Sequence, residues 1–237
     1  LEEQRRKYER TIAIAERIAA QEAIRLVPEG TGDAQARRQA KGKELAADLA
    51  GGLRQKVTEV EGELALTAHM LKQGPEYRLA RGFEGETATG FDQVWIKSDG
   101  GQDTEVVIAE AKGPGATLGN PAKGPQMSSQ WTMATILDMV KSGDPMGKQL
   151  LQAAIKGSPP IRGLVVEAAR NPGDPPIDRT GEVRPGGEDP RHWKLLNPTM
   201  LDNPRIRERL KYLLGDADPQ IRAQAQTLLD LADGVSR

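Results

Sequence analysis

The chain has 237 residues, 37% of them hydrophobic and 28% charged, which is typical of a globular protein with one substantial core or two small ones. It contains no cysteine, so disulfides and thiolate metal sites are excluded, and only two histidines, which leaves little room for a zinc site or a histidine-based triad. Carboxylate chemistry remains. The net charge of −1 shows no overall basic excess, and this counts against nucleic-acid binding.

Several simple features of the chain limit its class further. No stretch approaches the roughly 18 consecutive apolar residues of a membrane-spanning helix, so we expect no membrane insertion. Because the first residue is Leu1, we expect a fragment or processed piece. His69 and His192 lack partners at metal-ligand spacing, so both are expected to be structural.

The first third of the chain has helical patterns. Residues 2–27 predict one helix, and residues 33–50 predict a second, whose basic run favours a solvated face over a nucleic-acid contact. Gly51 and Gly52 then predict a break and a segment boundary. Residues 56–72 predict a third helix that ends before Gly74.

The middle of the chain alternates between strand and helix patterns. Strands are predicted at Tyr77–Phe83, Phe91–Ile96 and Thr104–Ala111, followed by a helix at Gln126–Val140 and a buried strand at Ile161–Ala168. This order predicts an α/β fold with a mixed central sheet flanked by helices.

The last third begins with a Pro- and Gly-rich stretch up to Arg191, which predicts a long surface loop or linker, with Trp193 anchoring it to the core. The tail from Pro204 to Ala232 predicts a capping helix pair that resembles one unit of a helical repeat. The chain therefore divides into a helical N-terminal segment (1–52), a core (53–172), and a loop with a C-terminal helical cap (173–237).

Two apolar runs separated by Ser98–Asp103 predict a β-hairpin. If its turn is centred near Gly101, Asp92 lies opposite Glu110. Two carboxylates about 5 Å apart across a strand pair repel each other unless a cation lies between them. Side chains two residues apart share a face of a strand, so Lys112 projects beside Glu110.

These residue types suit a magnesium-dependent hydrolytic centre. Mg²⁺ prefers oxygen ligands, which Asp92, Glu110 and the carbonyl of Ala111 would supply. Lys112 would orient the attacking water or offset developing negative charge. The alternative is a set of exposed charges at a strand end, with Glu110 and Lys112 as a surface pair of little energetic value. Because the hairpin register places Asp92 opposite Glu110, with Lys112 on the same face, we favour the functional interpretation.

The segments GFDQVW and VVIAEAKG resemble the PD-(D/E)XK, or restriction-endonuclease-like, nucleases, with Phe91 in place of the Pro of the motif name. More narrowly, the chain is similar to nuclease domains at the C-termini of bacterial polymorphic toxins over about a third of its length. The residues that carry this narrower similarity are Gly62, Glu63, Gly74, Gln126, Met127, Ser128 and Trp131.

The resemblance implies a restriction-endonuclease-like core, Mg²⁺ or Mn²⁺ as cofactor, and Glu63 as a helix-borne acid that is either a further metal ligand or the partner of a metal-bound water. Glu59 and Glu61 are its rivals. Gln126 and Gln130 share a helix face, where they either contact the scissile strand or hold the catalytic lysine, or form an ordinary polar face.

The loop between Lys112 and Gln126 has two interpretations: a lid with Lys123 as a phosphate contact, or an ordinary connection. The expected function is a DNA endonuclease toxin of interbacterial competition, delivered into the target-cell cytoplasm. Its expected partners are DNA, a cognate immunity protein and a secretion-apparatus carrier. The alternatives are an RNase or tRNase toxin using the same site, and a helical adaptor with a degenerate nuclease core.

Overall fold

The computed structural model describes residues 33–82, 90–119, 121–171, 173–182, 189–193, 195–196 and 198–234, and five residues near the N-terminus: Glu3, Arg6, Glu9, Arg10 and Ala13. The helix predicted over residues 2–27 lies almost wholly outside the described residues, as does the side chain of His192.

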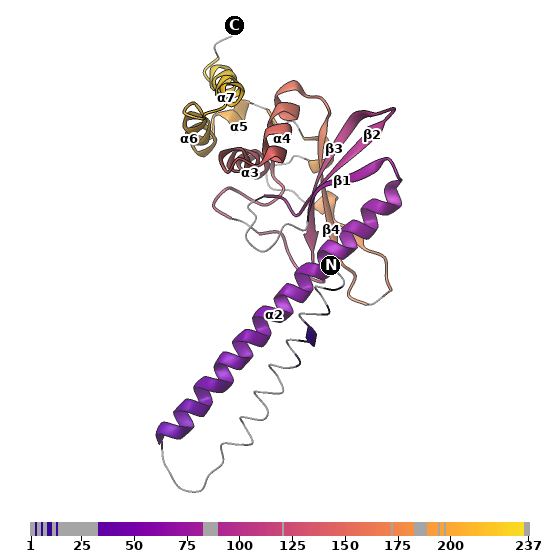
Figure 1. The fold of residues 1–237 in the computed structure, drawn as a ribbon, viewed down its shortest axis with the longest axis vertical. Helices are drawn as coiled ribbons and strands as arrows, with labels where there is room; N and C mark the ends of the chain where they lie inside the picture. The colour runs from indigo at the N-terminus through magenta and orange to yellow at the C-terminus, as the bar shows by residue number, and fades with distance from the viewer. Residues whose placement is uncertain are drawn as a thin grey trace.

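A single long helix, α2 (Asp33–Gln73, 41 residues), replaces two predicted ones. The predicted break at Gly51–Gly52 is wrong, and the helix crosses the boundary predicted between residues 52 and 53. A glycine in a helix costs only about 1 kcal/mol relative to alanine, so the strong helix formers on both sides carry the helix through. The first half of α2 extends beyond the sheet (Figure 1).

The described residues form a five-stranded sheet in the order β1-β2-β3-β4-β5. β3 and β4 are parallel and the other neighbouring pairs are antiparallel, so the mixed sheet flanked by helices is confirmed. The strands are β1 (Tyr77–Gly82), β2 (Gln93–Asp99), β3 (Gln102–Lys112), β4 (Ile161–Glu167) and β5 (Ile177–Asp178).

The β2–β3 hairpin has the predicted register. Gly100 and Gly101 have φ angles of 56° and 82°, and two positive φ angles are the requirement of the tight two-residue turn that matches strand twist. Gln93 pairs with Ala109, and the same pairing continues to Lys97. A register irregularity beyond Lys97 affects only the tip of the hairpin.

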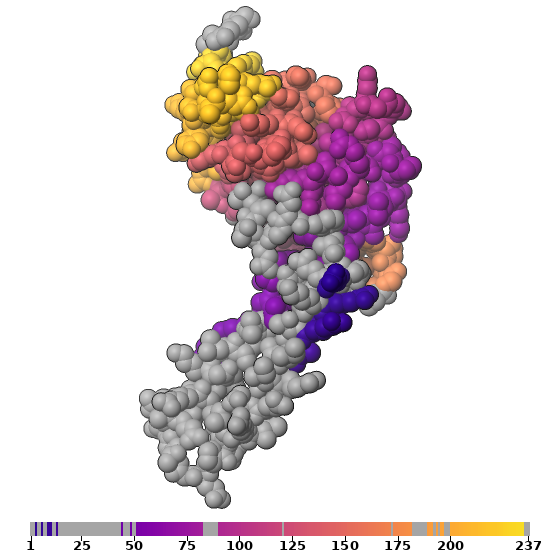
Figure 2. All heavy atoms as spheres, viewed as in Figure 1, coloured from indigo at the N-terminus to yellow at the C-terminus, as the bar shows by residue number. Residues whose placement is uncertain are grey.

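The two faces of the sheet carry different helices (Figure 1). Leu66 and Met70 of α2 pack against one face, over Trp95 and Val107. The other face carries Val94, Ile96, Val106 and Ile108 as predicted, in the same core as the C-terminal helices. Figure 2 shows the C-terminal helices and residues 129–156 as one continuous mass. The helices of this layer are α3 (Ser129–Lys141), α4 (Pro145–Lys156), α5 (Pro198–Leu201), α6 (Pro204–Leu213) and α7 (Pro219–Ala232).

Helix α4 was not predicted, although its signals are present in the sequence. Asp144 caps its N-terminus, Pro145 occupies the first turn, and Gly157 ends it in the left-handed conformation. With α3, it connects the parallel strands β3 and β4. The capping helix pair of the tail is confirmed as α6 and α7.

The stretch predicted as a surface loop or linker is partly packed on the sheet. It contributes β5 and the short 3₁₀ helices η1 (Thr180–Glu182) and η2 (Pro190–His192). The anchoring role of Trp193 is confirmed, since the ring is buried close to Gly163 of β4. None of the helices in the described ranges is long and apolar enough to cross a membrane.

Candidate active site

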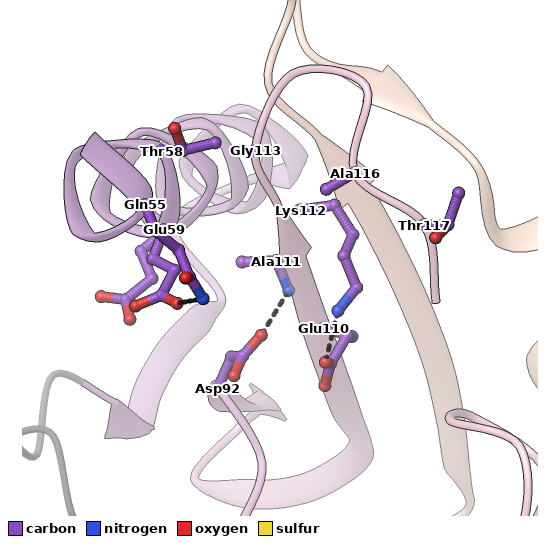
Figure 3. Close-up of a pocket in the computed structure, with 11 residues that line it drawn as sticks. Gln55, Thr58, Glu59, Asp92, Glu110, Ala111, Lys112, Gly113, Ala116 and Thr117 are labelled. Atoms are coloured by element: carbon purple, nitrogen blue, oxygen red, sulfur yellow. Dashed lines mark hydrogen bonds and ion pairs between the residues drawn. The ribbon is translucent and has the colours of Figure 1, made fainter. Parts of the chain in front are cut away.

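A pocket of about 420 Å³ lies where α2 crosses the end of β3 (Figure 3). It contains all four charged residues that the sequence singled out as a catalytic group. Its lining residues are Gln55, Thr58, Glu59, Glu63, Asp92, Glu110, Ala111, Lys112, Gly113, Ala116 and Thr117.

Two glycines allow α2 to approach this close to β3. A Cβ atom on Gly62 would lie 2.7 Å from the backbone carbon of Lys112, and one on Gly113 would lie 2.6 Å from the carbonyl oxygen of Thr58. Real Cβ atoms essentially never approach that closely. The glycine pair therefore sets the distance at which the acidic face of α2 meets the strand ends.

Asp92 immediately precedes β2 and extends the β2–β3 ladder with its side chain. Its Oδ2 accepts the N–H of Ala111 at 2.8 Å. In an extended strand the carbonyl of a residue points to the same side as its N–H, so the Ala111 carbonyl also faces Asp92. Burial raises the pKa of Asp92, outweighing the opposing effects of the Ala111 N–H and of Lys112.

The residue before Asp92 is fixed from two sides. The Phe91 ring packs edge-on against Trp131, with 5.5 Å between ring centroids and 70° between ring planes. Arg81 donates to the Phe91 carbonyl at 3.3 Å. Phe91 thus holds the backbone at Asp92 by packing.

Glu110 is 4% exposed and forms an ion pair with Lys112. Lys112 Nζ lies 2.9 Å from Glu110 Oε1, and Gln126 Nε2 donates to the same oxygen at 2.8 Å. Glu110 Oε2 receives no hydrogen bond from any residue that the structure describes. Burial, and then the charge of Asp92, raise the pKa of Glu110 to about 8.

Gln126 holds both members of the Glu-x-Lys motif. Its Oε1 accepts from Lys112 Nζ at 3.1 Å and from the Gly119 N–H at 2.6 Å. The next residue, Met127, is fully buried with φ of 63°, a conformation that side chains other than glycine rarely adopt. Ser128 then caps α3. Because α3 begins at Ser129, Gln126 precedes the helix and the predicted helix face shared with Gln130 is wrong. Of the roles considered for Gln126, its contact with Lys112 matches the one that holds the lysine.

The helix separates the three candidate acids of α2, Glu59, Glu61 and Glu63. Glu63 and Glu59 line the pocket, whereas Glu61 lines a different pocket beside Pro114. Burial, followed by the charges of Asp92 and Glu59, raises the pKa of Glu63 to about 7. Glu59 therefore remains a rival of Glu63, and Glu61 does not.

Lys123 and Gln130 do not line the pocket. Lys123 Nζ lies 2.7 Å from Asp138 Oδ2, and Asp138 also accepts from Arg209 of α6 at 2.7 Å. Gln130 donates to the Lys123 carbonyl at 3.1 Å. In this arrangement both residues fasten the loop to the helical layer, and their contact with nucleic acid stays a prediction.

Several residues that line the pocket beside the acids were not predicted from the sequence. Gln55 precedes Glu59 by four residues, which places both on one helix face. That spacing was the available signal. Ala116 and Thr117 come from a loop without periodicity, and Gly113 could not be distinguished from the other loop glycines.

The donor set fits a hard divalent cation. No group of three or more His, Cys, Asp or Glu residues in the described part of the chain forms a ready metal cage. Mg²⁺, however, commonly takes one or two carboxylates and completes its shell with water. Asp92, the open oxygen of Glu110 and the Ala111 carbonyl provide such a set. The pKa values of both acids are raised because burial outweighs the nearby charge of Lys112, so a bound cation would stabilise both carboxylates.

Comparison of the chain with protein-family models, with curated proteins and with solved structures gave no match.

Proposed function

We propose that the protein is a metal-dependent endonuclease of the PD-(D/E)XK type that hydrolyses phosphodiester bonds in DNA. One observation carries the proposal: Asp92 and Glu110 lie together at the end of one hairpin, with Lys112 fixed beside Glu110, in a pocket that Glu63 of α2 also lines. A structural surface pair needs neither the burial of Glu110 nor the Gln126 contact.

Each side chain then has a definite task. Asp92 and Glu110 would hold Mg²⁺ or Mn²⁺, which when bound polarises the phosphoryl group and acidifies a water molecule. Lys112 places its ammonium group at the reacting phosphate, because Glu110 and Gln126 both hold Nζ. Glu63, whose pKa in the metal-free pocket is raised to about 7, would accept a proton from the attacking water.

The order of elements supports a restriction-endonuclease-like core. A helix with an acid precedes an antiparallel three-stranded unit, then two helices and a parallel strand. Following the resemblance to polymorphic toxins, we propose a delivered effector that acts in the cytoplasm of a target cell, reached through a secretion-apparatus carrier and neutralised in the producing cell by an immunity protein. The same site would equally serve an RNase.

A substrate panel tests the enzymatic proposal. Purified protein is incubated with plasmid DNA and with total RNA, in Mg²⁺ and in chelator. The variants Asp92→Ala and Lys112→Ala should lose cleavage, whereas Glu61→Ala and Lys72→Ala, on α2 outside the pocket, should retain it. Cleavage of RNA alone would select the RNase alternative, and a wild-type chain inert on both would select a degenerate core.

Expression in a bacterial host tests the toxin proposal. The wild-type chain should arrest growth, and Lys112→Ala should not. Protection by the product of a neighbouring gene would identify the immunity protein. Equal growth with both chains, at equal protein levels, would contradict a toxic nuclease.

A further inference from the structure

The loop after β3 is held by an ion pair that lies outside the pocket, between the buried Glu167 and the partly exposed Arg179. Glu167 at the end of β4 accepts the Gly115 N–H on Oε1 at 2.6 Å and the Arg179 guanidinium on Oε2. Arg179 Nη1 also donates to the carbonyl of Ala116 at 3.1 Å. One ion pair thus binds an N–H and a C=O of consecutive loop residues.

The pair is itself anchored on the sheet. Glu167 is the register partner of Lys112 in the parallel ladder and is buried. The Arg179 N–H donates to the Val165 carbonyl at 2.9 Å, and Thr180 Oγ1 accepts the Val165 N–H at 2.9 Å. Both charged residues therefore start from backbone that the sheet edge fixes.

The loop that they hold forms one wall of the pocket. Gly113, Ala116 and Thr117 line it on this side, facing the Gln55 and Glu59 side of α2 (Figure 3). The metal-ligand candidates have their own contacts outside the ion pair: Asp92 accepts the Ala111 N–H, and Glu110 is held by Gln126, whose Oε1 also accepts the N–H of Gly119 further along the loop. Losing the ion pair should therefore loosen the wall without moving the acids.

We propose that Glu167 and Arg179 are positioning residues that fix the wall against which the nucleic-acid strand binds. This inference rests on the proposed nuclease function. Its consequence is a separation of effects: substrate binding depends on the pair, whereas metal binding does not.

The sheet offers a matched control. Arg162 of β4 pairs with Glu105 of β3 at 3.0 Å, at the other end of the same two strands. The two arginine side chains have similar exposure, 22% for Arg162 and 29% for Arg179, whereas Glu105 is more exposed than Glu167. The variants are Arg179→Met, Glu167→Gln and the conservative Arg179→Lys, with Arg162→Met as control. Lysine keeps the positive charge and has enough N–H donors for both contacts, but its side chain ends one bond short of the position of Arg179 Nη1, so its effect should be intermediate.

Three measurements are made on each folded full-length variant: hydrogen exchange of the loop amides, KM and kcat for DNA cleavage, and affinity for Mn²⁺. For Arg179→Met and Glu167→Gln we expect faster exchange at Gly115–Thr117 and a KM raised about tenfold, the size of a lost hydrogen bond to a charged group. Mn²⁺ affinity and kcat should stay within about twofold of wild type. Arg162→Met should match wild type throughout.

The outcomes are separable. Unchanged loop exchange or an unchanged KM in Arg179→Met would overturn the inference, as would an equal loss of Mn²⁺ affinity. If the wild-type chain neither cleaves DNA nor binds it in Ca²⁺, the proposed function fails, and the positioning role fails with it. The exchange measurement would then still decide whether the ion pair holds the loop.

Discussion

Replacing Gly62 by alanine perturbs the contact that brings α2 to the proposed active site. The new Cβ would lie 2.7 Å from the carbon and 2.9 Å from the oxygen of Lys112, and 2.9 Å from the Gly113 nitrogen. All three are backbone atoms of the sheet end, so no side chain can turn aside. Ordinary contact begins at 3.4 Å, so the helix must move by about 0.7 Å.

The expected result combines a modest loss of stability with a large loss of activity. Overpacking costs about 1–3 kcal/mol, and the better helix propensity of alanine returns about 1 kcal/mol. The shift carries Glu63 away from Asp92, and a displacement near 1 Å can cost roughly a hundredfold in rate. Urea denaturation and initial cleavage rates in Mg²⁺ measure the two effects separately.

Gly52→Ala is the matched control, because nothing lies within 4 Å of a Cβ at that position of the same helix. This variant should be about 0.5–1 kcal/mol more stable than wild type and fully active. If Gly62→Ala behaves like Gly52→Ala in both assays, the close approach of α2 does not set the geometry of the site.

Three further predictions concern charge. Lys112→Met should lower the cleavage rate roughly a hundredfold to a thousandfold with the fold retained, as followed by circular dichroism, and a rate near wild type would remove Lys112 from the chemistry. Glu63 and Glu110 have pKa values of about 7 and 8 in the folded chain instead of the ordinary 4.5. Between pH 4.5 and 8 the folded chain therefore binds more protons than the unfolded chain. Without metal, stability should therefore fall as the pH rises from 5 to 8, and calorimetry in two buffers should show Mn²⁺ releasing protons at pH 7; a melting temperature that rises over this range would contradict the shifts. Asp138→Asn should weaken the contact with Arg209 and lower the melting temperature by a few degrees, whereas an unchanged melting temperature would show that this contact does not stabilise the helical layer.

The hairpin shows how much of the site could be predicted from sequence. Its register follows from two local facts, the Gly100–Gly101 turn and strict alternation in the strands, and both act over a few residues. This sufficed to bring Asp92 to Glu110. It did not show that Asp92 would bind the Ala111 N–H, because that contact depends on where β2 begins.

The sequence-based predictions failed where packing between segments far apart in the sequence determines the structure. The Gly51–Gly52 signal is locally sound, but its energetic cost is too small to end a 41-residue helix. Glu59, Glu61 and Glu63 could be separated only by knowing which side of α2 meets β3. Glu167 lies 55 positions after Lys112 in the chain, and only the parallel β3–β4 pairing makes them neighbours.

The central claim is that Asp92 and Glu110 form a metal-dependent hydrolytic centre. The most direct test is the rate of DNA cleavage as a function of Mg²⁺ concentration, for wild type, Asp92→Asn and the Glu61→Gln control. We predict a saturable Mg²⁺ dependence for wild type and Glu61→Gln, and no cleavage by Asp92→Asn at any concentration. An Asp92→Asn protein that cleaves with the wild-type rate and the wild-type Mg²⁺ dependence would contradict the claim.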